Sequence, residues 1–216
     1  MVLSARTGQG RGARPVTPVW HVEAMGDEDF HDDHGDGYDD DNPYLPRTPE
    51  AYRAAWADLE RLWGETLAKA LTLEESQLHD SVGGEWSFVQ TLRHLAYATD
   101  LWVFAVVQGV PDPYDPLDLP FDGYERFPHP IAYERDARPP LADVLALRAD
   151  RVARVRAFLD GLTQEQIDST VEFRSEGWPF NEDFPVGPCL ATVVNEEWHH
   201  RRYAERDLDL LMRGTG

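Results

Sequence analysis

The segment from Ser87 to Gly109 constrains the fold of this chain more than any other feature. It reads SFVQTLRHLAYATDLWVFAVVQG, and apolar side chains recur on nearly every face of a helix drawn through it. Ser87 is a favourable N-cap residue at its start. A helix that is apolar all round is typical of a buried position. The segment therefore predicts a central, well-buried helix.

Three further segments repeat apolar residues at steps of three and four, as amphipathic helices do. The first begins near Pro49, the second runs from Pro140 to Leu159, and the third runs from near Pro188 to Gly214. Proline suits the first turn of a helix and glycine suits its end. The stripe of the first segment consists of Tyr52, Ala55, Trp56, Leu59, Leu62, Trp63, Leu67 and Leu71.

Two connections between these helices share a pattern. Thr72 and Glu75 have the spacing of a capping box that begins a short helix, and Thr163 and Gln166 repeat it. The chain thus reads as helix, short helix, helix, twice over, which predicts an all-α four-helix bundle with longer crossings. Residues 121–133 are rich in proline and glycine and predict a long ordered loop. Little alternating β pattern appears between the helices.

The negative charge of the chain is concentrated at its start. Residues 1–46 contain ten acidic residues and three arginines, and residues 27–41 read DEDFHDDHGDGYDDD. Such a segment repels itself and has too few apolar side chains to offset the entropy of ordering. We expect a disordered acidic tail over residues 1–46 and one bundle domain over residues 47–216. Met25 is an alternative start, and binding of a basic partner is one regulatory role open to the tail.

Composition excludes several classes of protein. The formal net charge of −20 repels phosphate backbones and anionic lipid, so we expect neither nucleic-acid nor membrane partners. No apolar run reaches the length of a membrane span, and the first residues do not resemble a secretory signal, which predicts a cytoplasmic protein. The single cysteine, Cys189, excludes a disulfide framework and a four-thiolate zinc site. Its expected role is packing of the last helix.

Three side chains could bind a metal ion. Glu196 and His200 stand four residues apart in NEEWHHRRYAERD, so a helix places them on one face, one turn apart. His94, in the middle of the apolar helix, is the obvious third ligand, because an unpaired imidazole there is costly. Two imidazoles and one carboxylate would leave coordination positions open, as catalytic metal sites do. Zinc is the first expectation, and nickel, iron and manganese accept the same donors.

The same residues have simpler interpretations. A histidine in a buried helix is often a hydrogen-bonded core residue, and a Glu–His pair at this spacing often only stabilises a surface helix. Glu196 with His199 also spells the E-x-x-H element of di-iron bundles. A di-iron site needs a second such element and further inward glutamates, and the helix that begins at Ser87 contains no glutamate.

The two segments GEWSFVQTLRHL and NEEWHHRRYAERDL are similar to the DinB-like superfamily of metal-binding four-helix bundles (DinB/YfiT-like). The Trp-Ser start of the buried helix, His94 within it and the His-His-Arg of the last helix carry the resemblance, which covers roughly residues 47–213. Many members have three histidine ligands. Glu196 departs from that pattern and resembles the mycothiol-dependent maleylpyruvate isomerase branch. The resemblance implies a metal site formed by His94, Glu196 and His200.

The resemblance also implies a reaction. Relatives are S-transferases or isomerases that use mycothiol or a similar small thiol, so the expected partners are a thiol and an electrophile, bound by a monomer or homodimer. Arg201, Tyr203 and Tyr97 are candidate substrate-binding residues, although Arg201 could instead pair with Glu197, four residues earlier. The alternative is a non-catalytic metal-binding or stress-response bundle. In that case a fourth protein ligand, such as His199 or a residue of the 109–139 loop, would close the site.

Overall fold

The computed structural model describes residues 42–128 and 130–214. The predictions of a disordered acidic tail and of an alternative start at Met25 fall on residues outside the described ones, except for residues 42–46. Of those five residues, Asn42 and Pro46 are buried and Tyr44 is half-buried. The Asn42 side-chain amide donates to Asn195 Oδ1 at 2.7 Å, and the ring of Tyr44 meets that of Trp198 edge-on at 5.5 Å.

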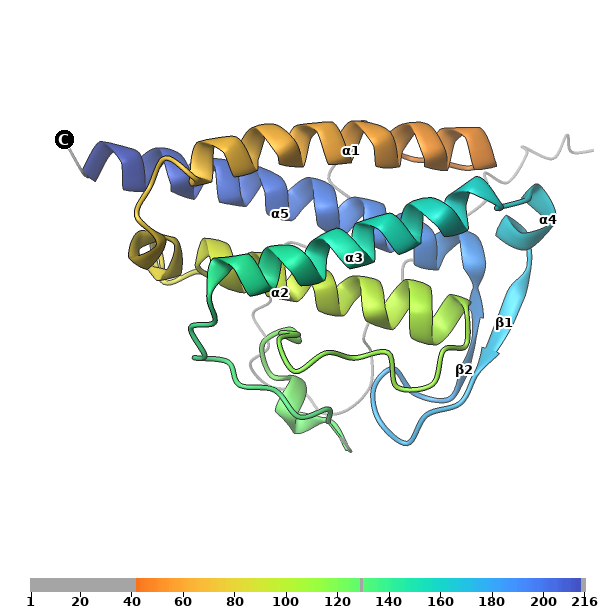
Figure 1. The fold of residues 1–216 in the computed structure, drawn as a ribbon. Coiled ribbons are helices and arrows are strands. Elements are labelled where there is room, and N and C mark those ends of the chain that lie inside the picture. Colours follow the sequence, from red (N-terminus) through yellow and green to blue (C-terminus); the bar gives the residue numbers. More distant parts are fainter. Residues whose placement is uncertain (1–41, 129, 215–216) are drawn as a thin grey trace, which may run out of the picture. The chain divides into compact units, whose positions relative to one another are not determined.

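Four long helices form the bundle, which confirms the predicted fold class. They are α1 (Pro49–Ala70), α2 (Phe88–Thr99), α3 (Leu141–Asp160) and α5 (Val186–Gly214). Figure 1 shows α1 beside α5 and α2 beside α3, and α2 also packs against α5 and α1 against α3. Each helix therefore has two neighbours in a closed arrangement. No helix of the described residues combines the length and apolarity that crossing a membrane requires.

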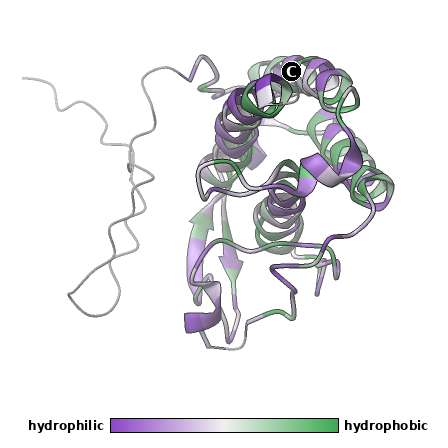
Figure 2. Ribbon diagram, turned by 90° about the vertical axis from the view of Figure 1, so that its left-hand side faces the viewer, coloured by the Kyte–Doolittle hydropathy of each residue, from purple (hydrophilic) through white to green (hydrophobic). Residues whose placement is uncertain are grey.

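The helices begin where their capping residues predict. The Thr48 side chain accepts a hydrogen bond from the Ala51 amide, and Ser87 and Gln90 form a reciprocal capping box at the start of α2. The predicted capping box of Thr163 and Gln166 is confirmed at the start of α4 (Gln164–Ile167). In the view of Figure 2, close to the bundle axis, hydrophilic and hydrophobic colours alternate along the helices, as amphipathic helices require.

The other predicted capping box is wrong. The Thr72 hydroxyl donates to the Lys69 carbonyl at 2.7 Å, because Thr72 belongs to the turn that ends α1. Glu74 and Gln77 form the reciprocal box instead, and it begins the 3-10 helix η1 (Glu75–His79). The short helix is therefore present as predicted, but it begins two residues later than the threonine suggests.

Two elements are not predicted by the periodicity. The buried helix changes to π-helical geometry after α2, over η2 (Asp100–Val107), although it continues as far as predicted. Two short strands, β1 (Thr170–Phe173) and β2 (Glu182–Pro185), form an antiparallel hairpin between α4 and α5. Each strand is four residues long, which is too short for alternation to stand out in the sequence.

A buried arginine of α2 holds the segment between η2 and α3, in which the predicted loop contains the short 3-10 helix η3 (Tyr124–Arg126). The side chain of Arg93 is fully buried, and its guanidinium donates to four backbone carbonyls of that loop. A cation is costly to bury, and these carbonyl oxygens satisfy its donors. The acceptors are the carbonyls of Leu117, Glu134, Arg135 and Ala137. Arg93 thereby fixes the loop against the helix that carries His94.

Candidate metal site

The three predicted ligands converge where α2 packs against α5. Glu196 Oε2 lies 3.0 Å from His200 Nε2 and 3.4 Å from His94 Nε2. One donor atom from each of the three residues lies within 4.8 Å of the other two. Such a spread is compatible with one shared cation. The helical spacing of Glu196 and His200 and the central place of His94 in α2 thus produce the juxtaposition that the sequence predicts.

Backbone of the neighbouring loop orients His94. Its Nδ1 lies 3.0 Å from the carbonyl oxygen of Leu119 in a buried contact. A carbonyl oxygen only accepts, so Nδ1 carries the proton, and in the neutral ring Nε2 keeps its lone pair. That lone pair is directed at the Glu196 carboxylate. This is the arrangement of a metal-binding histidine, whose second nitrogen is held by a hydrogen bond.

The electrostatics of the site favour an anionic Glu196. Burial alone would raise the pKa of this carboxyl, but hydrogen bonds from Nε2 of His200 and, when its ring is protonated, from Nε2 of His94 outweigh burial and hold its pKa well below the usual range. Burial lowers the pKa of the His200 imidazole, although Glu196 opposes that effect. A carboxylate and two imidazoles that release their Nε2 protons supply the electron pairs that a divalent cation needs.

The donor set fits a cation better than it fits a hydrogen-bonded core. Glu196 has no proton to share, and His94 directs a lone pair at it, so these two groups repel one another unless a cation or a proton lies between them. The side chains of Glu196 and His200 are 30% and 20% exposed, which leaves the site accessible from one side. Among the described residues, no fourth histidine, cysteine, aspartate or glutamate joins the three.

Aromatic rings line this centre. The indole of Trp86 lies 4.4 Å from the His94 ring centroid and is stacked on His200 at 5.7 Å, with an interplanar angle of 16°. Tyr203 meets the His200 ring edge-on at 6.0 Å and is 40% exposed. The sequence indicates only that Trp86 is a core or cleft aromatic. Its contact with both histidines comes from a loop that helical periodicity does not describe.

The other predicted substrate-binding residues lie in different surroundings. Tyr97 is buried behind His94, with ring centroids 6.2 Å apart, and packs on Tyr114 and Tyr124. The Arg201 guanidinium lies 3.5 Å from the Thr66 hydroxyl of α1 and 3.7 Å from Glu205, four residues later on α5. Tyr203 is the one of the three that combines exposure with a contact to a ligand. The substrate-binding roles of all three stay predictions.

The expected pairing of Arg201 with Glu197 is wrong. Glu197 is almost fully buried, and both of its carboxylate oxygens accept hydrogen bonds from Arg148 of α3 at 2.8 Å. Burial explains the choice, because a carboxylate inside the bundle requires a cation that is buried with it. The i, i+4 rule describes exposed helix faces and does not anticipate a partner from another helix.

Cys189 packs in the core, as predicted. It is buried within a cluster that contains Tyr97, Leu101 and Phe184. Burial raises the pKa of its thiol to about 12, so it stays protonated at neutral pH and is a poor nucleophile. His199, the other residue considered as a ligand, turns toward Tyr203, and its ring lies 6.3 Å from the tyrosine ring.

A second group of buried charges lies where η2 packs on α3. Arg151 donates to both carboxylate oxygens of Asp100 at 2.8 Å. Asp118, in the same loop as Leu119, is also fully buried. Burial and the nearby Asp100 charge raise the pKa of Asp118 to about 9. The sequence does not reveal this group, because its members come from three separate segments.

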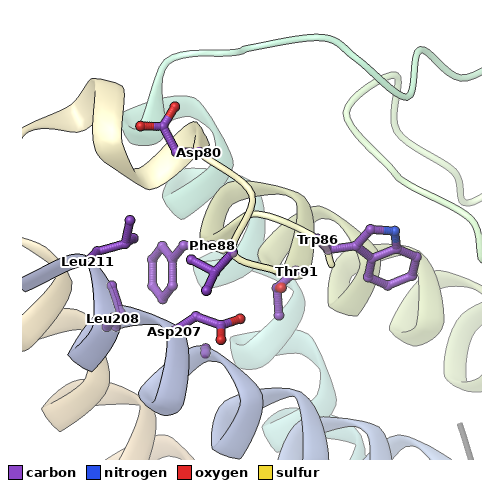
Figure 3. Close-up of a pocket in the computed structure, with 9 residues that line it drawn as sticks. Asp80, Trp86, Phe88, Thr91, Asp207, Leu208 and Leu211 are labelled. Carbon is purple, nitrogen blue, oxygen red and sulfur yellow. The ribbon is translucent and has the colours of Figure 1, made fainter. Parts of the chain in front are cut away.

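The small pocket in Figure 3 lies next to the centre but does not contain it. Phe88, Leu208 and Leu211 gather on one side of the pocket, and Trp86 turns away from them. The pocket has room for about one water molecule. None of the three candidate ligands lines it. It is therefore a packing gap between α5 and the start of α2, and Trp86, which lines it, also contacts both histidines.

A helical bundle with two imidazoles and a carboxylate converging between its helices defines a class of candidate metalloproteins. A family model of the DinB superfamily matches residues 51–204, which include all three candidate ligands. The chain belongs to the DinB superfamily. No curated protein and no solved structure was found to match the chain.

Proposed function

We propose that this protein binds one divalent cation through His94, Glu196 and His200 and uses it to transfer a small thiol to an electrophile. Isomerisation of a substrate through a thiol adduct is the variant of the same chemistry. The observation that carries the proposal is the convergence of three electron-pair donors within 4.8 Å, on a side of the bundle that is partly exposed. Divalent-metal binding within the DinB superfamily supports it.

The residues of the centre have separate tasks in this proposal. When bound, a divalent cation lowers the pKa of a thiol or water molecule beside it. Glu196 supplies the negative charge that holds the cation, and the Leu119 carbonyl keeps His94 in the tautomer that binds. The thiol proton leaves to solvent, and the sulfur forms a C–S bond with the electrophile. In a transfer the leaving group departs, and in an isomerisation the C–S bond breaks again.

Mycothiol is the thiol that we propose first. This choice follows from the resemblance of the ligand set with Glu196 to that of the mycothiol-dependent branch. The composition supports it, because 19 of the 20 Lys and Arg residues are arginines and Lys69 is the one lysine. Arginine codons are favoured in G+C-rich genomes, and mycothiol suits such a host. We place the reaction in the cytoplasm, where small thiols are kept reduced.

Metal content and thiol consumption together test the proposal. Purified protein is analysed for bound metal, stripped with a chelator, and reloaded with Zn²⁺, Ni²⁺, Fe²⁺ or Mn²⁺. Each form is then assayed for loss of free thiol, with mycothiol or glutathione and a panel of electrophiles. We expect about one metal ion per chain and thiol consumption that the chelator abolishes and the metal restores.

The competing function is a non-catalytic metal-binding or stress-response bundle. It predicts one metal ion per chain without turnover, because a fourth protein ligand closes the coordination sphere. His129 of the 109–139 loop lies outside the described residues, so a His129→Ala variant belongs in the same assay. Stoichiometric metal, no thiol consumption with any electrophile, and loss of metal in that variant would favour the non-catalytic protein.

A further inference from the structure

The indole of Trp86 touches both histidines of the candidate metal site. Its ring centroid lies 4.4 Å from that of His94 and 5.7 Å from that of His200, and the planes of the indole and the His200 ring are nearly parallel. Trp86 precedes α2 and reaches the site from the loop that joins η1 to α2. It therefore touches ligands from both helices that form the centre, without lying on either helix.

The two histidines are oriented in different ways. His94 is held through Nδ1 by the Leu119 carbonyl, which is the usual support of a metal-binding imidazole. Within residues 42–128 and 130–214, no comparable hydrogen bond to His200 Nδ1 is found. The His200 ring contacts Glu196 through Nε2 at 3.0 Å, and the aromatic rings of Trp86 and Tyr203 flank its plane. Trp86 supplies the nearly parallel face, and Tyr203 meets the ring edge-on.

The indole is itself held in place. Its Nε1 donates to Asp122 Oδ1 at 3.2 Å, and Asp122 also pairs with Arg135. Asp122 lies three residues after Leu119, in the segment that Arg93 anchors through the Leu117 carbonyl. One short stretch of loop thus reaches both imidazoles, directly at His94 and through the indole at His200. A hydrogen-bonded indole has one fixed orientation, which a free one does not.

We propose that Trp86 is a positioning residue of the metal site and that Asp122 acts through it. The stack replaces, for His200, the hydrogen bond that orients His94, and it keeps Nε2 directed at the cation position. This inference rests on the proposed metal site. Supporting groups of this kind change metal affinity by roughly 10–100-fold when they are removed.

Binding of Co²⁺ to the full-length protein tests the role of the ring. Affinity is measured by competition with a coloured chelator, and the visible absorption of bound Co²⁺ reports the geometry of its ligands. We expect Trp86→Leu to weaken Co²⁺ binding by roughly 10–100-fold and to change the spectrum. Trp86→Phe keeps a flat ring but loses the hydrogen bond to Asp122, so it is expected to bind Co²⁺ less tightly than the wild type and more tightly than Trp86→Leu.

A second pair of variants tests the hydrogen bond. The Asp122 side chain is 63% exposed, so Asp122→Ala is compatible with folding. It is expected to weaken Co²⁺ binding about as much as Trp86→Phe does. The double variant Asp122→Ala, Trp86→Phe is expected to bind no more weakly than either single variant, because both substitutions remove the same hydrogen bond. Asp122→Asn retains an oxygen acceptor and is expected to lose less. Trp102→Phe is a matched control that is expected to bind as the wild type does.

The outcomes separate this inference from the proposed function. Wild-type protein that fails to bind Co²⁺ would overturn the metal site itself. A folded Trp86→Leu variant with wild-type affinity and spectrum would overturn only the positioning role. If Trp86→Leu does not fold, Asp122→Ala decides the question, and wild-type affinity in Asp122→Ala together with Trp86→Phe would overturn the proposal.

Discussion

His94 is tied to the protein at one ring nitrogen and presents the other to Glu196. The tie to the Leu119 carbonyl leaves a lone pair on Nε2, 3.4 Å from the carboxylate. The spacing of Glu196 and His200 predicts that this pair shares a helix face. The third member, His94, is predicted from its place in the buried helix and from the resemblance to the DinB-like superfamily. The support by Leu119 and Trp86 could not be predicted, since both come from loops whose course no periodicity describes.

Substitution of the ligands should remove the metal. His94→Ala and His200→Ala each delete a donor, and we expect metal affinity to fall by more than about 100-fold, beyond the effect of losing a supporting group. Glu196→Gln retains the shape but loses the negative charge, so we expect weaker binding. His199→Ala is the matched control on the same helix and should retain about one ion. Stoichiometric metal in all three ligand variants, measured by elemental analysis, would contradict the assignment.

Asp118 should make stability depend on pH. Its pKa is about 9 in the folded protein, against about 3.9 in an unfolded chain. The folded state therefore holds a proton that the unfolded state has lost, so stability is greatest below pH 4 for this group and decreases as pH rises toward 9. The slope is at most about 1.4 kcal/mol per pH unit.

Urea unfolding at pH 5, 7 and 9 measures this slope. Asp118→Asn replaces the carboxyl by a neutral group of the same size, so the variant should lose most of the decrease between pH 5 and 9. Equal slopes in wild type and variant would show that Asp118 is ionised in the folded protein.

At the scale of elements, the metal site joins α2 to α5, and the buried ion pair of Asp100 and Arg151 joins η2 to α3. The long helices could be predicted because their apolar stripes repeat over many turns. The π-helical geometry of η2 and the hairpin of β1 and β2 could not, because each depends on contacts with distant segments. Glu197 shows the same limit, since its partner Arg148 lies on another helix.

Removal of the metal should loosen the contact between α2 and α5. A ligand that binds only the folded state stabilises it by about 2.7 kcal/mol when present at 100 times its Kd. For a domain of this size, that corresponds to a rise in Tm of roughly 5–10 °C. Thermal unfolding followed by circular dichroism, with metal and with chelator, measures the shift. His94→Ala should show the lower Tm in both conditions, and a metal-induced shift in that variant would point to a different site.

For the whole molecule, the described part begins before the predicted domain does. Asn42 contacts Asn195 of α5, and Tyr44 contacts Trp198 of the same helix. The bundle therefore includes two residues that the sequence assigns to the tail, because they lie next to an acidic run. The charge pattern that marks the tail says nothing about which of its last residues have partners. Asn42 and Asn195 are 153 positions apart, and patterns of neighbouring residues do not predict a contact between such distant positions.

Two truncations should therefore differ. A chain that starts at residue 42 keeps the contacts of Asn42 and Tyr44 and should match the full chain in stability and metal affinity. A chain that starts at residue 47 loses two hydrogen bonds, from Asn42 to Asn195 and from Tyr44 to Asp58, and one aromatic pair, which together cost about 2–3 kcal/mol. Urea unfolding of both chains measures the difference. Equal stability would mean that these contacts contribute nothing, and loss of metal binding in the first chain would give the tail a role at the site.

Anomalous X-ray diffraction from crystals grown with Zn²⁺ tests the central claim most directly. The triad predicts a single strong peak per chain, about 2.0–2.2 Å from His94 Nε2, His200 Nε2 and a Glu196 carboxylate oxygen. A peak on other residues, or crystals with excess Zn²⁺ and no peak between α2 and α5, would contradict it.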